Sequence, residues 1–352
     1  MLSTRAKLRL LAEPLLPRSR EPESVAAFFG RRLGPEPLQR LIDPFVSGVY
    51  AGNPQELSMQ AAFPRLWQAE QRAGSLLLGM LTAPRPKRQK GEARSQRRLF
   101  SFHKGLATWP QAIARFLGPE RLWTGARALD LRPTDGEWHV TVQRAGVVAH
   151  LLVSQVILAV PAAVAAHLVD RLDAQAAAAL RAIPYPPVTL VHLGYRRSDV
   201  AHPLDGFGLL CPSDENAKVL GTLWPSSLFP NRAPAGSVLT TAFVGGARNS
   251  VLTNQSEEAL IAMVHAEQQR IIGVRAEPVF ARTIRWPQAI PQYNAGHLRR
   301  IAAIAQLEQR RLGLHLIGNY RGGISVEACW QQGRAAAALV ARLIAHEPAP
   351  TQ

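Results

Sequence analysis

The fold is decided by the stretch Leu314-His315-Leu316-Ile317-Gly318-Asn319-Tyr320-Arg321-Gly322-Gly323-Ile324-Ser325-Val326. Residues 314–317 predict a short strand and residues 318–323 a glycine-rich turn, after which Ser325 caps a helix that continues to about Ile344. A strand that leads through such a turn into a helix places free backbone N–H groups beside the positive end of the helix dipole. This arrangement suits a pyrophosphate. The spacing is neither GxGxxG nor a P-loop, however, so on spacing alone an ordinary turn that binds nothing is favoured over an anion site.

The middle of the chain predicts a mixed α+β unit. Trp138, Val140 and Val142 alternate with polar neighbours after an Asp135-Gly136 turn, which is typical of a strand. The apolar run 153–160 predicts another strand, and Pro161 opens a helix that stops before Pro184. Further predicted elements are a strand over 188–193, two strands within 219–246 and a helix from its cap Ser256 to Gly273.

The first part of the chain predicts short helices. Ser3 is a plausible N-cap for leucines at helical spacing, and helical patterns recur at 25–33, at 38–42 and around 61–81. Residues 43–54 between these patterns are expected to form a loop. A basic run then predicts a solvated linker, with a boundary near Leu99. It contains Arg85, Lys87, Arg88, Lys90, Arg94, Arg97 and Arg98.

Composition and the lengths of the apolar stretches argue against a disulfide-rich, metal-binding or membrane-spanning protein. The chain has 352 residues, 47% of them hydrophobic, and can bury a substantial core. Its formal charge of +16 favours anionic partners, namely nucleic acid, an anionic bilayer or a carboxylate-bearing substrate. Only two cysteines are present, without ligand spacing, so we expect neither disulfides nor a metal site. No apolar stretch reaches the roughly 20 residues of a membrane span and no signal peptide is recognised, so we expect a cytoplasmic chain, with a peripheral location at a membrane left open.

The string from Gly318 to Val326 resembles the C-terminal flavin motif of the protoporphyrinogen oxidases of haem and chlorophyll synthesis. Other segments resemble the same family in the family's order and extend the resemblance over nearly the whole chain. They are Leu2–Leu8 with Glu13-Pro14, Ile42–Pro54, Gly206–Leu210 and Ser226–Pro234.

The resemblance implies FAD as cofactor and a porphyrinogen as substrate. The cofactor contacts that it implies are Ala128, Asn319, Ile324, Ser325 and Val326. For the substrate it implies Phe229 as the stacking aromatic, Leu210 as an apolar wall and Gly48 as a point of close backbone approach. Arg232 is left open between a substrate carboxylate, a protein carboxylate and solvent. No catalytic side chain is assigned, because the flavin would be the electron sink and the protein would orient a bridging carbon.

The implied reaction is the oxidation of protoporphyrinogen IX to protoporphyrin IX in three two-electron steps, with oxygen as acceptor. The implied fold class is α+β: an incomplete FAD/NAD(P)-binding fold of the amine-oxidase type, a mixed-sheet substrate domain and a helical membrane-docking region. We expect residues 1–98 to be the helical docking region, with the linker at 82–98. We expect 99–165 and 310–346 to belong to the FAD-binding domain and 166–309 to be the substrate domain.

A dinucleotide fold also needs a first strand, glycine-rich turn and helix, followed by an acidic residue about 20 residues on. The sequence shows no such unit, and Met1 aligns with the interior of the family. We therefore expect a chain that lacks the N-terminal FAD-binding segment and binds FAD weakly. A non-catalytic porphyrin- or membrane-binding remnant and another enzyme like an amine oxidase or a carotenoid desaturase stay open. As partners, a membrane surface and a homodimer stay open too, whereas nucleic acid is not expected because the basic run lacks interleaved aromatics.

Overall fold

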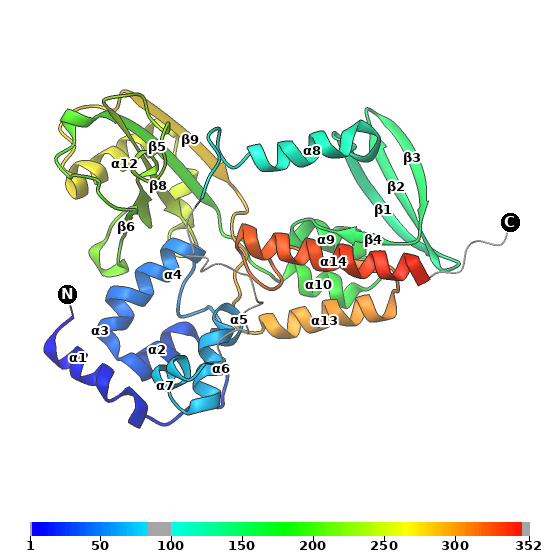
Figure 1. The fold of residues 1–352 in the computed structure, drawn as a ribbon, viewed down its shortest axis with the longest axis horizontal. Coiled ribbons are helices and arrows are strands. Elements are labelled where there is room, and N and C mark those ends of the chain that lie inside the picture. The colour runs from blue at the N-terminus through cyan, green and yellow to red at the C-terminus, as the bar shows by residue number, and fades with distance from the viewer. Residues whose placement is uncertain (1, 84–99, 347–352) are drawn as a thin grey trace, which may run out of the picture. The chain divides into compact units, whose positions relative to one another are not determined.

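The computed structural model describes residues 2–83 and 100–346, and these form two compact units. Met1–Gly118 and Pro186–Ala289 make up the first unit, and Pro119–Tyr185 and Ile290–Gln352 the second (Figure 1). The units divide the chain at 118/119, 185/186 and 289/290, whereas the predicted functional domains divide it at 98/99, 165/166 and 309/310. Compact units and functional domains are different divisions, so the predicted domains stay a prediction. Residues 84–98 of the predicted linker lie outside the described residues.

The first unit begins with the short helices that the sequence predicts. Serine side chains cap four of them: the hydroxyl oxygens of Ser3, Ser24, Ser58 and Ser75 accept backbone N–H groups in the first turns of α1, α2, α5 and α7. The elements are α1 (Thr4–Leu11), η1 (Glu13–Leu15), α2 (Val25–Leu33), α3 (Pro35–Pro37), η2 (Leu38–Ile42), α4 (Asp43–Tyr50), α5 (Met59–Ala62), α6 (Pro64–Ala73) and α7 (Leu76–Leu81).

The expected loop over 43–54 is wrong for its first part, because Asp43–Tyr50 forms the helix α4. Pro44 lies in the first turn, where a missing N–H costs no hydrogen bond, and Asp43 favours the positive end of the helix dipole. The helix ends where Ala51 adopts a left-handed conformation, with φ of 49°. Gly48 therefore lies within a helix and not within a flexible loop.

A buried ion-pair network ties the helices together. Arg32, Glu13 and Glu70 all have 0% exposure. Arg32 contacts Glu70 at 2.5 Å and Glu13 at 3.1 Å. The Glu13 carboxylate also accepts the hydroxyl of Ser75 at 2.5 Å and the N–H of Leu76 at 2.9 Å, where α7 begins. The network thus joins η1, α2, α6 and α7 around Arg32, and Arg31 adds a second cation 2.9 Å from Glu70.

The rest of the first unit is built on an antiparallel sheet in the order β6-β7-β8-β5-β9. The helix α12 packs on β5 and β9. Ser256 caps α12 and Gly273 ends it with a left-handed φ of 64°, as predicted. The bounds are β5 (Val188–Arg196), η3 (Arg197–Asp199), β6 (Gly208–Leu210), η4 (Ser213–Glu215), β7 (Gly221–Leu223), α11 (Pro225–Leu228), β8 (Ser237–Gly245), η5 (Ser250–Asn254), α12 (Glu257–Ile272) and β9 (Phe280–Trp286).

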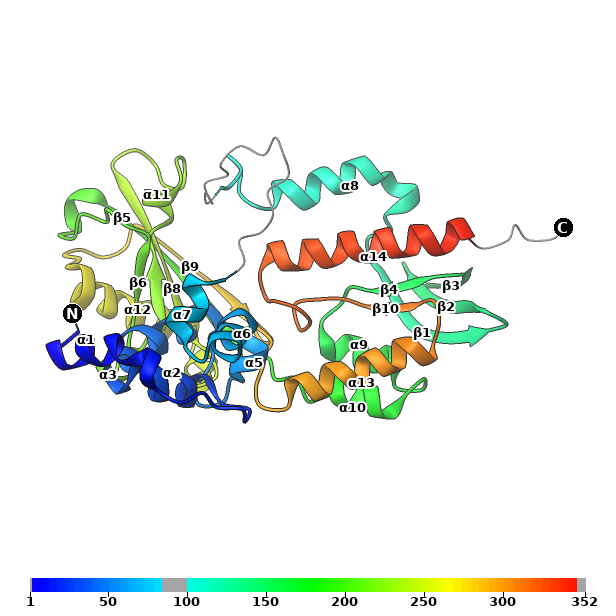
Figure 2. The ribbon, with the colours of Figure 1, turned by 60° about the horizontal axis from the view of Figure 1, so that its bottom comes forward.

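The second unit combines a three-stranded antiparallel sheet, β1-β2-β3, with a parallel pair, β4 and β10. Figure 2 shows this pair between α14 on one side and α9, α10 and α13 on the other. The helix α8 (Thr108–Arg121) spans the limit between the units and breaks at Gly118, whose φ is 72°. The bounds are β1 (Ala126–Thr134), β2 (Glu137–Arg144), β3 (Val147–Val153), β4 (Val156–Leu158), α9 (Ala162–Val169), α10 (Ala174–Arg181), α13 (His297–Arg310), β10 (Leu314–Leu316) and α14 (Val326–His346).

Two predicted elements of this unit are each divided in the structure. The strand expected over 153–160 is split at the polar pair Ser154-Gln155 into the ends of β3 and β4. The helix expected from Pro161 to just before Pro184 is split into α9 and α10, because the Asp173 side chain accepts the N–H of Ala176 and so starts a new helix.

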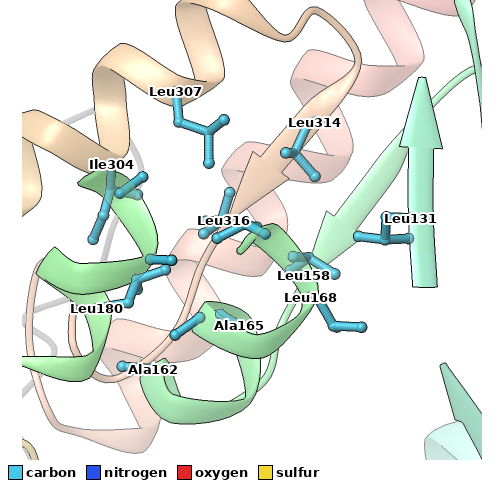
Figure 3. Close-up of a cluster of buried hydrophobic side chains, with 14 of the residues drawn as sticks. Leu131, Leu158, Ala162, Ala165, Leu168, Leu180, Ile304, Leu307, Leu314 and Leu316 are labelled. Carbon is cyan, nitrogen blue, oxygen red and sulfur yellow. The ribbon is translucent and has the colours of Figure 1, made fainter. Parts of the chain in front are cut away.

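The core of the second unit lies where the parallel pair meets its helices. Figure 3 shows Leu158, Leu314 and Leu316 from the pair directed toward Leu180 and Leu307 on the helices. Removing these side chains from water is the main stabilising contribution of the unit. The mixed helix-and-sheet architecture confirms the predicted α+β class. No helix in the described part of the chain is long and apolar enough to cross a membrane.

Replacing Arg32 by methionine tests the buried network. Arg32→Met leaves Glu13 buried without its cation and removes one of the two guanidinium groups that pair with Glu70, so we expect a loss of about 3–5 kcal/mol in the free energy of unfolding. Arg270→Met is the matched control in the same unit, because Arg270 pairs with Glu267 while 52% of its side chain is exposed. This control should change stability by less than about 1 kcal/mol. Urea unfolding followed by circular dichroism measures both, and equal small losses would contradict the assignment.

Candidate functional site

The glycine-rich turn between β10 and α14 forms as the sequence predicts. Gly318, Gly322 and Gly323 have φ of 153°, 80° and 133°, which L-residues with a side chain rarely adopt. A Cβ added at Gly318 would lie 2.8 Å from the ring of Tyr320, and one at Gly323 would lie 2.9 Å from the Cβ of Ala328. The turn therefore depends on glycine for both its conformation and its close contacts.

Side chains of the second unit hold the C-terminal end of β10 and the start of the turn. The Arg321 guanidinium donates to both carboxylate oxygens of Glu308, at 2.8 and 2.7 Å, and to the carbonyl of Leu316 at 2.9 Å. Glu308 in turn accepts the N–H of Leu316 at 2.8 Å. Both backbone groups of Leu316 are thus bound by this ion pair. The amide oxygen of Gln332 accepts the N–H of Gly318 at 3.2 Å.

The predicted cofactor residues Ile324, Ser325 and Val326 lead directly into α14. The Ser325 hydroxyl accepts the N–H of Ala328 at 3.0 Å, which caps the helix as predicted. Val326 is 63% exposed, and the first turn of this long helix points its N–H groups outward. Asn319 is half-buried in the middle of the turn. Four of the five predicted cofactor residues thus lie in the turn and at the start of α14, and their role toward a cofactor stays a prediction.

The fifth predicted cofactor residue, Ala128, lies on β1, at the edge of the three-stranded sheet. Its side chain is exposed, and the pairing of β1 with β2 shifts register between Ala128 and Asp130. Such an irregularity redirects the side chains of an edge strand. The role of Ala128 toward a cofactor stays a prediction.

An apolar cavity of about 460 Å³ in the first unit brings together two of the three predicted substrate residues, Gly48 and Leu210. A Cβ at Gly48 would lie only 2.2 Å from Cδ2 of Leu210, so α4 and β6 can approach this closely only because residue 48 is glycine. Of the described residues that line the cavity, none carries a titratable side chain. The complete lining is Phe45, Gly48, Val49, Phe207, Gly208, Leu209, Leu210, Gly221, Thr222, Leu223 and Phe243.

Contacts at its two ends hold α4 against this cavity. The Asp43 carboxylate pairs with Arg248 and accepts the N–H of Ser213 at 3.0 Å. Burial would raise the pKa of Asp43, but the hydrogen bonds from Arg248 and Ser213 outweigh it and the pKa falls below its usual value. At the other end, the carbonyl of Ala51 accepts the N–H of Ala247 at 2.8 Å.

Phe229, the third predicted substrate residue, does not line this cavity in the described part of the chain. The guanidinium carbon of Arg232 lies 5.7 Å from the centroid of its ring. Arg232 itself donates to the carbonyls of Phe102 and His103 and to the hydroxyl of Ser101. Arg232 thus holds residues 101–103, and a role toward a substrate carboxylate stays a prediction.

Sequence reasoning missed three aromatic residues of the lining, of which Phe243 lies on β8 and the other two are Phe45 and Phe207. Phe45 and Phe207 are 43% and 48% exposed and line the apolar cavity beside Leu210. Both lie inside the segments Ile42–Pro54 and Gly206–Leu210 on which the family resemblance rests. The family resemblance therefore pointed to both segments, but only the folded chain shows that the two segments meet at the cavity.

The residues of the turn fit a flavin dinucleotide in part. Glycines at positive φ keep the backbone uncovered, the start of α14 offers N–H donors and positive dipole, and Asn319 offers a side-chain amide. These groups suit a pyrophosphate and the polar edge of a flavin ring. Within residues 2–83 and 100–346, no group of three or more His, Cys, Asp or Glu residues could hold a metal ion.

Comparisons with known proteins agree with the resemblance in the sequence. Residues 2–341 match the family model described as flavin containing amine oxidoreductase. The chain is 36% identical over 325 residues to the chloroplastic protoporphyrinogen oxidase of Nicotiana tabacum, a match that covers 87% of this chain and 59% of that protein. It is 28% identical over 340 residues to the coproporphyrinogen III oxidase of Bacillus subtilis, covering 96% of this chain and 71% of that one.

A solved structure of a candidate protoporphyrinogen oxidase from Exiguobacterium has the same fold. Its TM-score is 0.77 at 21% sequence identity, and the match covers 96% of this chain and 72% of that one. The resemblance to protoporphyrinogen oxidases is thus confirmed in sequence, and the amine-oxidase type of fold in structure. The chain spans about three fifths of the length of the tobacco relative.

A buried histidine beside the turn makes the stability of the second unit sensitive to pH. His297 is 2% exposed and its Nε2–H donates to the carbonyl of Tyr320 at 3.0 Å. Burial lowers its pKa from 6.5 to about 4. Below pH 6.5 the imidazole of His297 binds a proton in the unfolded chain but stays neutral in the folded chain. The free energy of unfolding should therefore fall by about 3 kcal/mol between pH 6.5 and pH 4.

His297→Gln isolates this contribution, because glutamine does not titrate. We expect the free energy of unfolding of the variant to fall less steeply with pH over this window than that of the parent chain. Parallel urea titrations from pH 7 to pH 4 measure the two slopes. Identical slopes would show that His297 is not the titrating group.

Proposed function

Because the chain belongs to the family of flavin-containing amine oxidoreductases, we propose that it serves the flavin-dependent oxidation of protoporphyrinogen IX to protoporphyrin IX, with oxygen as acceptor. The pathway would be porphyrin biosynthesis, toward haem or chlorophyll. The observation that carries the proposal is the apolar cavity in which Gly48 and Leu210 meet. The family resemblance implies a substrate role for each of these two residues, and the cavity is where they would share one ligand.

The lining of the cavity supports a large, flat, apolar substrate. Its volume of about 460 Å³ lies within the range of about 300–1,000 Å³ that is usual for ligand pockets. Phe45 and Phe207 can stack on a pyrrole ring, and Leu210 supplies a wall. A lining without cations favours a ring with vinyl and methyl groups over one with more carboxylates. This supports protoporphyrinogen over the coproporphyrinogen named for the Bacillus relative.

The proposal assigns Asn319, Ile324, Ser325 and Val326 to FAD, with Ala128 as a further contact. Bound flavin would supply the electron acceptor for each two-electron step. The chain would supply orientation and exclusion of water, since the described lining of the substrate cavity offers no acid or base. The backbone N–H groups at the start of α14 would bind the pyrophosphate.

We further propose that this chain by itself holds FAD only weakly. In support, Ala336 is the one buried residue of α14 among those whose side chains are described, although the helix is 21 residues long. A groove of about 570 Å³ runs between α13, β10 and α14. An additional strand–turn–helix, packed on this apolar helix, would complete the cofactor site.

The exposed leucines of the first helices support a membrane surface as a further partner. Leu8, Leu11 and Leu15 are 62%, 77% and 86% exposed and follow helical spacing near Arg5 and Arg9. An apolar stripe flanked by cations suits the surface of an anionic bilayer. A peripheral location at a membrane and a homodimer that covers the same stripe both belong to the proposal.

An oxidation assay tests the proposed function. Purified chain with FAD from micromolar to millimolar concentration should convert protoporphyrinogen IX to the fluorescent porphyrin faster than FAD alone, with a rate that increases with FAD. Coproporphyrinogen III and simple amines should be slower substrates. Oxidation of an amine but not of porphyrinogen, or no increase over free FAD at any concentration, would contradict the proposal.

Gly48→Ala tests the cavity directly. The new methyl group would displace the Leu210 side chain into the cavity, because the two carbons would otherwise lie 2.2 Å apart. We expect protoporphyrin to bind roughly tenfold more weakly, as judged by quenching of its fluorescence. The control is Gly333→Ala on α14, where an added Cβ meets nothing within 4 Å. Unchanged porphyrin affinity in a folded Gly48→Ala protein would remove the cavity from the substrate site.

A further inference from the structure

One phenol spans the two ends of the glycine-rich turn. The Tyr293 hydroxyl donates to the carbonyl of Asn319 at 2.6 Å and accepts the N–H of Gly323 at 3.0 Å. Tyr293 is only 4% exposed, so solvent does not compete effectively for these bonds. A single oxygen thus fixes the distance between the first and last parts of the turn.

A second phenol fixes the direction of the Asn319 side chain. The Tyr185 hydroxyl accepts the N–H of Ala162 at 3.3 Å and therefore directs its one proton to Oδ1 of Asn319, at 3.1 Å. Burial raises the pKa of Tyr185 to about 12, so the hydroxyl keeps that proton at neutral pH. Because Oδ1 faces Tyr185, the amide nitrogen of Asn319 is the end left to donate toward a ligand.

A stacked histidine holds the first phenol in place. The rings of Tyr293 and His297 lie with centroids 4.2 Å apart and planes inclined by 13°. His297 donates to the carbonyl of Tyr320 at 3.0 Å, so the segment 293–297 binds two successive carbonyls of the turn. Neutral imidazole suits this position, because its ring is 2% exposed and its acceptor is an uncharged carbonyl.

We infer that Tyr293 and Tyr185 are positioning residues for the cofactor-facing turn. Tyr293 sets the shape of the backbone from Asn319 to Gly323, and Tyr185 sets which end of the Asn319 amide points toward the flavin. Neither residue contacts the cofactor in this assignment. The inference rests on the proposed function only for the identity of the ligand, because the hydrogen bonds exist within the chain itself.

Two measurements on the full chain test the inference. Amide hydrogen exchange, followed by mass spectrometry of peptides over 317–329, reports the turn without any ligand. Titration with FAD, followed by quenching of flavin fluorescence, reports the cofactor. Tyr293→Phe removes two hydrogen bonds, so exchange within 318–323 should become about tenfold faster, and FAD should bind about tenfold more weakly.

Tyr185→Phe should give a different pattern. It removes the proton that orients Asn319 but leaves both bonds of Tyr293, so FAD affinity should fall severalfold while exchange at Gly323 stays unchanged. Tyr195→Phe is the matched control: Tyr195 is 0% exposed and its hydroxyl contacts Nδ1 of His265 at 3.0 Å in the first unit. This control should alter neither the turn nor FAD binding.

Several outcomes would overturn the inference. Exchange that becomes faster across α9, α10 and β4 as well as the turn would show that Tyr293 is a general core residue. An effect of Tyr293→Ala that Tyr293→Phe does not share would assign the role to ring stacking and not to the hydroxyl. If the parent chain binds no FAD at millimolar concentration, the proposed function fails, and the exchange measurement still decides whether Tyr293 shapes the turn.

Discussion

The parallel pairing of β10 with β4 is the interaction on which the second unit depends. Leu314–Leu316 pair in register with Val156–Leu158, and the core of the unit packs on this pair. Since the two strands run in the same direction, both lead into their helices at the same edge. There the turn after β4 meets the glycine-rich turn after β10, and the Tyr185 hydroxyl bonds to both, at Ala162 and Asn319. Pairing of the strands therefore creates the edge at which the predicted cofactor turn lies, and the side chains around it give that edge its shape.

In the first unit, polar contacts at both ends of α4 hold this helix beside the apolar cavity. The ion pair of Asp43 with Arg248 and the backbone contact of Ala51 anchor the two ends of α4 to the loop after β8. Gly48 then faces Leu210 at a distance that no other residue allows. Polar contacts position the helix outside the cavity, so the lining itself can remain apolar.

Local signals predicted much of this fold. The caps Ser3, Ser256 and Ser325, the helix Val25–Leu33 and the strand–turn–helix at the C-terminal end follow from hydrogen bonding and periodicity within a few residues. The expected loop at 43–54 was wrong over 43–50, because Pro44 favours the start of a helix as readily as a turn. Contacts between segments that are distant in sequence could not be predicted. Examples are the bridge that Tyr293 makes across the turn, the hydrogen bonds of Arg232 to residues 101–103 and the position of Phe207 in the cavity lining. The predicted substrate role of Gly48 and Leu210 came from family resemblance, and no spacing rule would have joined the two residues.

The proposed function requires one chain to combine an apolar porphyrin cavity with a flavin-facing turn. A crystal structure of the chain with protoporphyrin IX and FAD tests it most directly. We predict a porphyrin ring against Phe45, Phe207 and Leu210, and a pyrophosphate at the N–H groups that start α14. A porphyrin bound elsewhere on the first unit, with the cavity beside Gly48 left empty, would contradict the account.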